Sequence, residues 1–131
     1  MGEELYAAVR FRAGFRCEYC RLPEASSDLP FPVDHIIARQ HWGRTELDNL
    51  ALACQRCNAH KGPNLATIDW PSEDLIRLYH PRKDRWDDHF RWEAATIVGI
   101  TPVGRATARL LDMNSARRVA TRLWLMQEGL F

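Results

Sequence analysis

The pattern of apolar and polar positions divides the first half of the chain into short segments separated by turn-forming residues. Residues 3–13 predict a short helix, and a loop rich in Pro, Ser and Asp follows at 21–30. The β-branched run at 31–37 predicts a strand, and residues 51–54 predict a second short strand or a turn. Residues 55–61 predict a short helix that the following Gly-Pro pair stops. After the first helix, the predicted order is strand, loop, turn, helix.

The second half follows a different pattern, in which prolines interrupt segments rich in aromatic and charged side chains. Residues 92–100 predict a strand or one arm of a hairpin. Thr101 and Pro102 are a capping residue and a first-turn proline, so a helix is predicted from there to about Met113. Asn114 is predicted to cap a last helix. The apolar residues of that helix recur at helical spacing, at Val119, Leu123, Met126 and Leu130.

Length and composition favour one compact unit. With 131 residues, 46% of them apolar, the chain can bury a core and lacks the bias of a disordered protein. We therefore expect a single domain over 1–131, with a core at 1–65 and a C-terminal extension at 66–131 packed on it. The N-terminus carries acids where a signal peptide needs basic residues, and no apolar stretch is long enough to cross a membrane. We expect a cytoplasmic protein that has no membrane partner.

The net charge of +1 by itself neither indicates nor excludes a nucleic-acid partner, because binding depends on where the charges lie. After residue 100, however, five basic residues stand against two acidic ones. Arg105 and Arg109 lie one helical turn apart there, as do Arg118 and Arg122, opposite the apolar stripe. This arrangement predicts either a surface that grips phosphates or an ordinary solvated helix face.

Two C-x-x-C pairs are the candidate metal ligands: Cys17, Cys20, Cys54 and Cys57. Each pair places two thiolates on one tight turn, and two such turns form the tetrahedral sulfur cage that zinc favours. Thiols stay reduced in the cytoplasm, which argues against disulfides. A redox pair or buried free thiols are the alternatives, but a redox motif would leave the other pair without a role. With four sulfur ligands the zinc has no open position, so we expect a structural ion.

The 33 residues between the two pairs hold Asp34, His35 and Asn49, and Asn58 directly follows the second pair. The string CEYC, then VDHI, then DNLALACQRCNAHKG resembles the four-cysteine branch of the HNH endonucleases, whose fold is called the ββα-metal or His-Me finger. The resemblance covers roughly residues 15–62. It implies an α+β fold, in which a zinc-bound ββα-metal nuclease core precedes a short strand or hairpin and C-terminal helices.

The resemblance also implies a role for each of these residues. His35 would be the general base that deprotonates the attacking water, and Asp34 would give a carboxylate to a divalent cation. Asn49 would be structural, its amide tying down the loop that holds the base. Asn58 would be the second ligand of the cation, from the short helix. Together they imply a metal-dependent endonuclease that hydrolyses DNA, although the same site would also serve an RNA nuclease.

These residue types suit phosphodiester hydrolysis. A neutral His activates water at pH 7, and a hard cation held by carboxylate and amide oxygens neutralises charge on the phosphoryl group. Many members of the family have His where this chain has Asn58, and an amide oxygen favours Mg²⁺ or Mn²⁺ as the catalytic cation. Neighbours on a regular strand point to opposite faces, so Asp34 and His35 predict a strand end or a bulge. Lys61, three residues after Asn58, either contacts a phosphate or is solvated.

Each residue also has a plain structural explanation. Asp34 and His35 could form a surface pair, Asn49 could be a turn residue, and Asn58 could merely follow a zinc knuckle. The alternative function is therefore a non-catalytic zinc-knuckle module that binds nucleic acid or protein. Arg82 belongs to a stretch of interleaved basic and aromatic residues, 80–92, that either contacts DNA or packs through its rings. The apolar C-terminus either packs back on the core or forms a homodimer contact.

Overall fold

The computed structural model describes residues Met1–Phe131, and the chain divides into two compact units, Met1–Pro63 and Asn64–Phe131. The division falls close to the boundary expected at residue 65. The expected single domain, with the second part packed on the first, stays a prediction. No helix in either unit combines the length and the apolar character that crossing a membrane requires.

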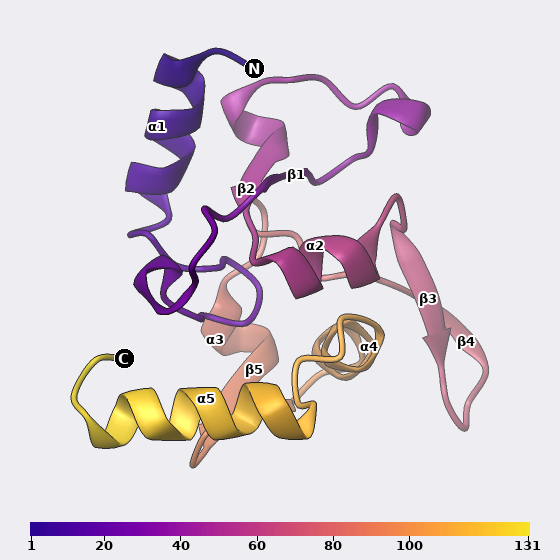
Figure 1. Ribbon diagram of the computed structural model, residues 1–131. Helices are drawn as coiled ribbons and strands as arrows, with labels where there is room; N and C mark the ends of the chain where they lie inside the picture. The colour runs from indigo at the N-terminus through magenta and orange to yellow at the C-terminus, as the bar shows by residue number, and fades with distance from the viewer. The chain divides into compact units, whose positions relative to one another are not determined.

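The first unit consists of two α-helices, one small hairpin and three short 3-10 turns (Figure 1). Its elements in chain order are α1 (Glu3–Arg12), η1 (Glu24–Ser26), β1 (Val33–His35), η2 (Arg39–His41), η3 (Leu47–Asn49), β2 (Leu50–Leu52) and α2 (Gln55–Lys61). β1 and β2 pair antiparallel, and α2 follows β2 after two residues. The ββα order predicted from the sequence is confirmed, as is the α+β class.

The caps of α2 explain why this short helix forms at this place. Cys54 is its N-cap, and the Cys54 sulfur accepts a hydrogen bond from the backbone N–H of Cys57 at 3.4 Å. Gly62 follows the last helical residue with φ of 51°, a conformation that glycine adopts without strain, and Pro63 cannot continue the helix. The second zinc knuckle and the helix start are therefore the same piece of backbone.

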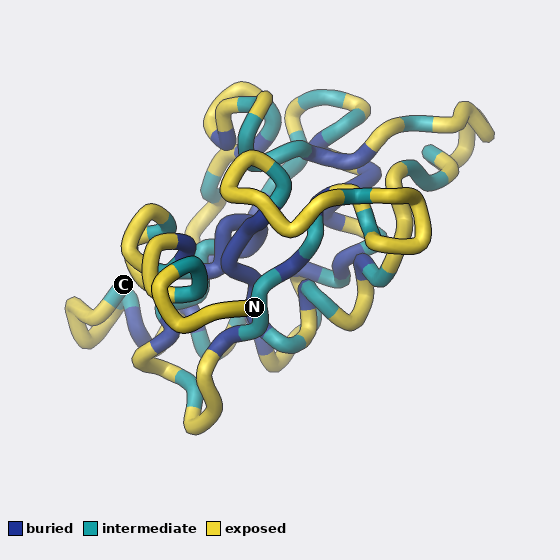
Figure 2. The backbone as a smooth tube through the Cα atoms, turned by 90° about the horizontal axis from the view of Figure 1, so that it is seen from above, coloured by how far each residue is buried: buried dark blue, intermediate teal, exposed yellow.

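The core of the first unit lies around the hairpin. All three residues of β2 are buried, and the dark blue stretches of Figure 2 mark such buried backbone. The side chain of Arg12, at the end of α1, donates hydrogen bonds to the carbonyls of Leu47 and Leu50. Tyr6 of the same helix donates to the carbonyl of Phe31 at 2.8 Å. Helix α1, with Val9 as its one buried residue, is thus attached to the hairpin mainly by polar contacts.

The second unit contains two hairpins and three α-helices. Its elements are β3 (Ala66–Asp69), β4 (Asp74–Arg77), α3 (Trp86–His89), β5 (Phe90–Glu93), β6 (Thr96–Gly99), α4 (Pro102–Leu110) and α5 (Ala116–Gln127). Residues 92–100, expected to form a strand or one arm of a hairpin, span the end of β5, the turn and all of β6. The helix start at Thr101 is confirmed, and the Thr101 hydroxyl accepts from the N–H of Gly104 at 3.0 Å. The β3–β4 hairpin and α3 were not predicted.

Aromatic rings and close backbone contacts hold this second unit together. Trp86 lies 5.1 Å from Phe90 and 5.4 Å from Trp92, centroid to centroid. Rings of the 80–92 stretch therefore pack on one another inside their own unit. Helix α4 lies directly on β6, because a Cβ on Gly99 would come within 2.3 Å of the backbone nitrogen of Arg105. A side chain at Gly99 would push the helix off the hairpin.

Asp84 organises the turn before α3. Its carboxylate accepts two hydrogen bonds from Arg77, at 2.7 and 3.1 Å, and one from the N–H of His80 at 2.8 Å. Burial alone would raise the pKa of Asp84, but these donors outweigh it and lower the pKa below the ordinary value. The charged form of Asp84 is therefore the one that the fold stabilises.

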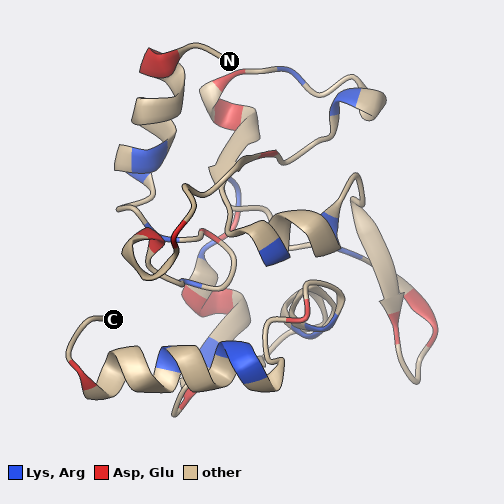
Figure 3. Ribbon diagram, viewed as in Figure 1, with Lys and Arg blue, Asp and Glu red and all other residues tan.

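The last helix presents the opposite face to the one expected. Arg118 and Arg122 are buried, together with Leu125, whereas the apolar residue Leu123 is exposed. Helix α5 carries basic residues, blue in Figure 3, that the sequence pattern placed on a solvated or phosphate-binding face. That expectation is wrong for Arg118 and Arg122.

Backbone carbonyls explain why two arginines are buried. Arg118 donates to the carbonyls of Leu111 and Asp112 at 2.7 and 2.8 Å, just beyond the end of α4, where helical carbonyls have no partner within the helix. The fully buried Arg122 donates to the carbonyls of Ala95 and Met113 and to the side chain of Asn114. Asn114 therefore does not cap α5.

The actual N-cap of α5 is Ser115. Asn114 instead exchanges two hydrogen bonds with the backbone of Ile97, as a neighbouring strand would, its oxygen accepting at 2.8 Å and its amide donating at 2.7 Å. Arg122 and Asn114 thus join the hairpin to the last helix.

Candidate metal centre and active site

The four cysteines of the first unit form one buried cluster. Their sulfur atoms all lie within 4.8 Å of one another, and the sulfurs of Cys20 and Cys54 are 3.7 Å apart. Four sulfurs at the usual zinc–sulfur distance of about 2.3 Å from one ion stand about 3.8 Å from each other. The two C-x-x-C turns also match, because the N–H of Cys20 donates to the sulfur of Cys17 at 3.4 Å, as Cys57 does to Cys54.

The surroundings of the sulfurs favour a bound cation. Burial raises the pKa of the Cys17 and Cys57 thiols well above their ordinary value, so thiolates there need a compensating charge. A zinc ion supplies that charge, and in structural sites it is held by four ligands in a tetrahedron. The donor set and its spacing are those of a structural zinc site.

The hairpin places Asp34 and His35 on opposite faces. Val33, Asp34 and His35 pair with Leu52, Ala51 and Leu50 without a bulge, and His35 is the last residue of β1. Asp34, 4% exposed, points into the domain, whereas His35 is half-buried. The strand thus ends at this pair of residues.

Asp34 is the centre of a buried polar cluster. Its carboxylate accepts a hydrogen bond from the hydroxyl of Tyr19 at 2.7 Å, and the Lys61 ammonium lies 3.2 Å from the same oxygen. Burial raises the pKa of Asp34, and the charge of Lys61 and the hydrogen bond from Tyr19 oppose that rise. Lys61, 2% exposed, also donates to the carbonyls of His35 and Ile36 at 3.3 and 3.1 Å. Lys61 is therefore directed into the domain and away from solvent, where a phosphate would have to bind.

His35 has the properties of a neutral imidazole held at one nitrogen. Its Nε2 lies 2.9 Å from the hydroxyl oxygen of Thr45, and its ring is otherwise partly open to solvent. Burial lowers the pKa of His35 below the ordinary 6.5, and the positive charge of Arg39 lowers it further. At pH 7 the imidazole is therefore uncharged and able to accept a proton.

Asn49 closes the loop that joins β1 to β2. Its amide oxygen accepts from the N–H of Ile37 at 2.8 Å, and its amide nitrogen donates to the carbonyls of Ile37 and Arg44 at 3.0 and 2.9 Å. The carbonyl of Asn49 accepts from Ile36 at 2.8 Å. Gly43 fits beneath this network, since a Cβ there would lie 1.6 Å from the Ile37 carbonyl oxygen. The segment after His35 therefore has a defined course.

Asn58 lies in the first turn of α2, half-buried. It precedes Lys61 by three residues, so both belong to one helix face, and Lys61 reaches Asp34 from there. Asn58 therefore belongs to the face of α2 from which Lys61 contacts Asp34.

The remaining predicted substrate contacts belong to the second unit. Arg105 and Arg109 are exposed on α4 and line a hollow of about 410 Å³ together with β6 residues and Asp112. Arg82 is half-buried, and its backbone N–H donates to the imidazole of His80 at 3.1 Å. The two arginines of α4 are accessible to a phosphate, whereas Arg82 is less accessible because it packs partly against its own turn.

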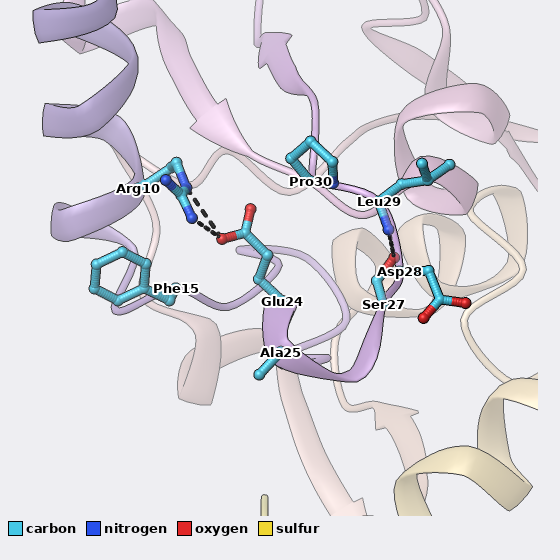
Figure 4. Close-up of a pocket in the computed structure, with 8 residues that line it drawn as sticks. All are labelled: Arg10, Phe15, Glu24, Ala25, Ser27, Asp28, Leu29 and Pro30. Atoms are coloured by element: carbon cyan, nitrogen blue, oxygen red, sulfur yellow. Dashed lines mark hydrogen bonds and ion pairs between the residues drawn. The ribbon is translucent and has the colours of Figure 1, made fainter.

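A further hollow of the first unit, also about 410 Å³, lies beside α1 and η1 (Figure 4). Two of the charged residues that line it, Arg10 and Glu24, form an ion pair with each other. The second carboxylate oxygen of Glu24 accepts from the N–H of Phe31 at 2.9 Å. The ion pair thus serves to hold the loop before β1 in place.

Two residues of the site were missed at the level of sequence. Tyr19 lies between the first two cysteines, and the zinc pattern of that segment involves only the cysteines. The signal that could have identified it is that a buried tyrosine needs a hydrogen-bond partner for its hydroxyl, which here is Asp34. Thr45 lies in a loop ten residues after His35 and carries no motif signal. Only the course of the loop, closed by Asn49, brings Thr45 to the imidazole.

Residues 17–64 match the family model described as HNH endonuclease, a span that includes all four cysteines, Asp34, His35, Asn49 and Asn58. The chain therefore contains an HNH endonuclease domain with a four-cysteine cluster, as the resemblance implied. Neither the curated proteins nor the solved structures yielded a match.

Proposed function

We propose that the protein is a metal-dependent endonuclease that hydrolyses phosphodiester bonds in DNA. The observation that carries the proposal is the state of His35. It stands at the end of β1 with a pKa below its ordinary value, its Nε2 lies 2.9 Å from the Thr45 hydroxyl, and it falls within the span that matches the HNH family. A binding module has no need for such a base.

The hydrogen bond to Thr45 suggests which nitrogen acts. When Nε2–H donates to the Thr45 hydroxyl oxygen, Nδ1 keeps its lone pair and accepts the proton of the attacking water. Asn49 keeps the loop that carries Thr45 closed, and so holds the imidazole in one orientation. Asn49 and Thr45 are thus positioning residues in this mechanism, and His35 is the catalytic base.

Asp34 and Asn58 would hold the catalytic Mg²⁺ or Mn²⁺, which supplies neutralisation of charge on the phosphoryl group and the leaving oxygen. A carboxylate and an amide oxygen suit a hard cation by their chemistry, although the Asp34 carboxylate is buried, faces away from His35 and is engaged by Tyr19 and Lys61. The contact between the Lys61 ammonium and Asp34 indicates that this carboxylate attracts positive charge. The repulsion between the same ammonium and a metal cation would, however, weaken the binding of the cation at Asp34. We propose that Lys61 balances the buried carboxylate and takes no part in binding substrate.

The rest of the proposal concerns substrate and assembly. Arg105 and Arg109, with Arg82, would contact the DNA backbone from the second unit, and RNA is the alternative substrate for the same site. A reducing cytoplasm would keep the four thiols available to zinc. Exposed apolar residues near the C-terminus, Leu123 among them, would form the contact of a homodimer.

One observation favours the second candidate function, a non-catalytic zinc-knuckle module. Asp34, the proposed cation ligand, is buried and already engaged by Tyr19 and Lys61. A domain that had lost catalysis would keep such a cluster purely for its stability. This candidate predicts nucleic-acid or protein binding that is independent of His35 and of added divalent cations.

Plasmid cleavage distinguishes the two candidates. Supercoiled plasmid is incubated with zinc-loaded protein and Mg²⁺ or Mn²⁺, beside His35→Ala and a chelator control in which retained zinc is measured. His60→Ala, which removes an exposed histidine of α2, is the matched control. We expect the loss of His35 to slow cleavage about 10²–10⁴-fold, the usual contribution of a general base, and the loss of His60 to leave it unchanged. Uncut plasmid under all metals, or equal cutting by His35→Ala, would refute the proposal.

A further inference from the structure

Trp42 is the most exposed large apolar side chain of the protein, at 89%. It belongs to the loop between β1 and β2, between His35 and Thr45 in the chain. A solvated indole contributes nothing to the core, and water makes its exposure unfavourable. Nothing in the folding of the first unit therefore accounts for a tryptophan at this position.

The backbone under Trp42 is ordered by several hydrogen bonds. Trp42 has a left-handed φ of 63°, and its N–H donates to the carbonyl of Arg39 at 2.9 Å. The N–H of Gly43 donates to the carbonyl of Ala38 at 3.0 Å, and Asn49 holds the carbonyl of Arg44. A non-glycine residue in this conformation carries backbone strain. The loop thus presents the indole outward from a fixed backbone.

This position lies close to the proposed base. Trp42 precedes Thr45 by three positions, and three residue steps span at most about 11 Å between Cα atoms; the Thr45 hydroxyl lies 2.9 Å from the imidazole of His35. Nucleotides of one strand rise about 3.4 Å each along duplex DNA, so this distance corresponds to about three nucleotides. A strand cleaved at His35 would therefore pass within reach of the indole.

The charges of the loop suit a polyanion. Arg39 and Arg44 flank Trp42 and are exposed, and both belong to the loop whose basic residues are blue in Figure 3. Arg44 also lies 3.5 Å from Glu46, a contact between two exposed side chains that contributes little. Basic side chains near an aromatic ring are a common means of binding single strands, in which the cations contact phosphates and a base stacks on the ring.

We propose that Trp42 stacks on an unpaired nucleobase of the nucleic-acid substrate next to the cleaved bond, while Arg39 and Arg44 bind the flanking phosphates. This inference rests on the proposed function for its substrate class. It adds a binding surface outside the proposed catalytic residues. Because any base offers a π-face, this contact favours locally unpaired nucleic acid and carries little sequence preference.

Binding measurements in the cleavage-silent His35→Ala background test the surface directly. Fluorescence anisotropy follows a labelled single-stranded oligonucleotide in titrations of the full chain with Trp42→Ala and Trp42→Phe. Trp124→Ala, which removes a 56% exposed tryptophan of α5, is the matched control. We expect Trp42→Ala to weaken binding about 5- to 150-fold, the usual effect of losing one base–aromatic stack, and Trp42→Phe to retain most of the affinity.

Salt dependence separates the ring from the cations. Trp42→Ala should leave the slope of log affinity against log salt unchanged, whereas Arg39→Gln and Arg44→Gln should each reduce it by about 0.7 for a single strand. On an oligonucleotide short enough to bind in a single register, an abasic site at one position should abolish the difference in affinity between the parent protein and the Trp42→Ala variant. That position is expected within about three nucleotides of the cut.

The outcomes keep the two proposals apart. If the protein cleaves plasmid but Trp42→Ala binds and cleaves like the parent, or loses no more than Trp124→Ala, the stacking surface is refuted and the nuclease stands. If no plasmid is cut but binding still depends on Trp42 and on the abasic position, the surface stands and the nuclease fails. A Trp42 that matters only for binding another protein would show no abasic effect, which also refutes the inference.

Discussion

The buried pair of Asp34 and Lys61 offers the sharpest test of how the first unit is built. Both side chains are almost fully buried and lie 3.2 Å apart. Replacing Lys61 by Met leaves a buried carboxylate with Tyr19 as its one remaining donor among these contacts, and it removes a donor from the carbonyls of His35 and Ile36. Breaking such a pair from one side costs about 3–5 kcal/mol, because the remaining charge is buried without compensation.

A double-mutant cycle measures the pair itself. Lys61→Met and Asp34→Asn should each destabilise the unit by about 3–5 kcal/mol, whereas the double variant should cost clearly less than their sum, since neither charge is then left alone. The assay is urea unfolding in constant excess zinc, with zinc release as the monitored signal. This signal reports on the first unit because all four cysteines belong to it. Tyr6→Phe, which removes a hydroxyl bond outside the cluster, is the control for additivity.

Two results would refute this reasoning. Single costs below about 1 kcal/mol would mean that the pair is solvated in the manner of a surface salt bridge. Strictly additive costs in the double variant would mean that Asp34 and Lys61 do not stabilise each other. A cycle with strong coupling would also explain why Lys61 is absent from the proposed substrate contacts.

Two further predictions concern the zinc cluster and the second unit. Cys57→Ser should lower zinc affinity, stability and plasmid cleavage together, whereas His35→Ala should lower cleavage alone. Zinc content, thermal unfolding and plasmid nicking measure the three properties. A stable Cys57→Ser protein with full zinc would contradict the structural role of the site. Asp84→Asn should destabilise the second unit by about 1–2 kcal/mol at pH 7, through loss of charged hydrogen bonds to a partly exposed Arg77. The pKa of Asp84 is lower in the folded than in the unfolded chain, so the unfolded chain binds more protons between the folded pKa and the ordinary 3.8. The stabilisation by charged Asp84 is therefore fully present above pH 3.8 and disappears as the pH falls through the folded pKa. Urea unfolding of both proteins from pH 7 to pH 2 checks this, and a gap that stays constant with pH would count against it.

Local signals predicted the elements that have local causes. The cap of α4 at Thr101 and the stop of α2 at Gly62 follow from the capping rules and are present in the structure. The cysteine pattern predicted its cluster because ligand spacing restricts the chain strongly. These features depend on a few neighbouring residues, so the sequence alone sufficed.

The failures have a common physical origin in partners distant along the chain. Periodicity assigned Arg122 to a solvated face, because no local rule reveals that the carbonyls of Ala95 and Met113 accept hydrogen bonds from its guanidinium. Lys61 was expected at a phosphate or in solvent for the same reason, since its partner Asp34 is 27 residues away. Buried cations are decided by tertiary contacts, and hydrophobic patterning cannot detect them.

The two ends of the loop between β1 and β2 are fixed by contacts outside the loop as well as by Asn49 within it. Strand pairing joins its ends at His35 and Leu50, and the four cysteines hold the chain on both sides of the hairpin. The cost of closing a longer loop grows only with the logarithm of its length. Apart from Gly43, Thr45 and Asn49, which set the course of the loop and contact His35, the residues between the strands can therefore be exchanged at small cost to the cysteine scaffold. The segment around Trp42 can thus vary between related domains without disturbing the cysteine scaffold, and if the proposed stacking holds, exchanging it would change which nucleic acids the domain binds.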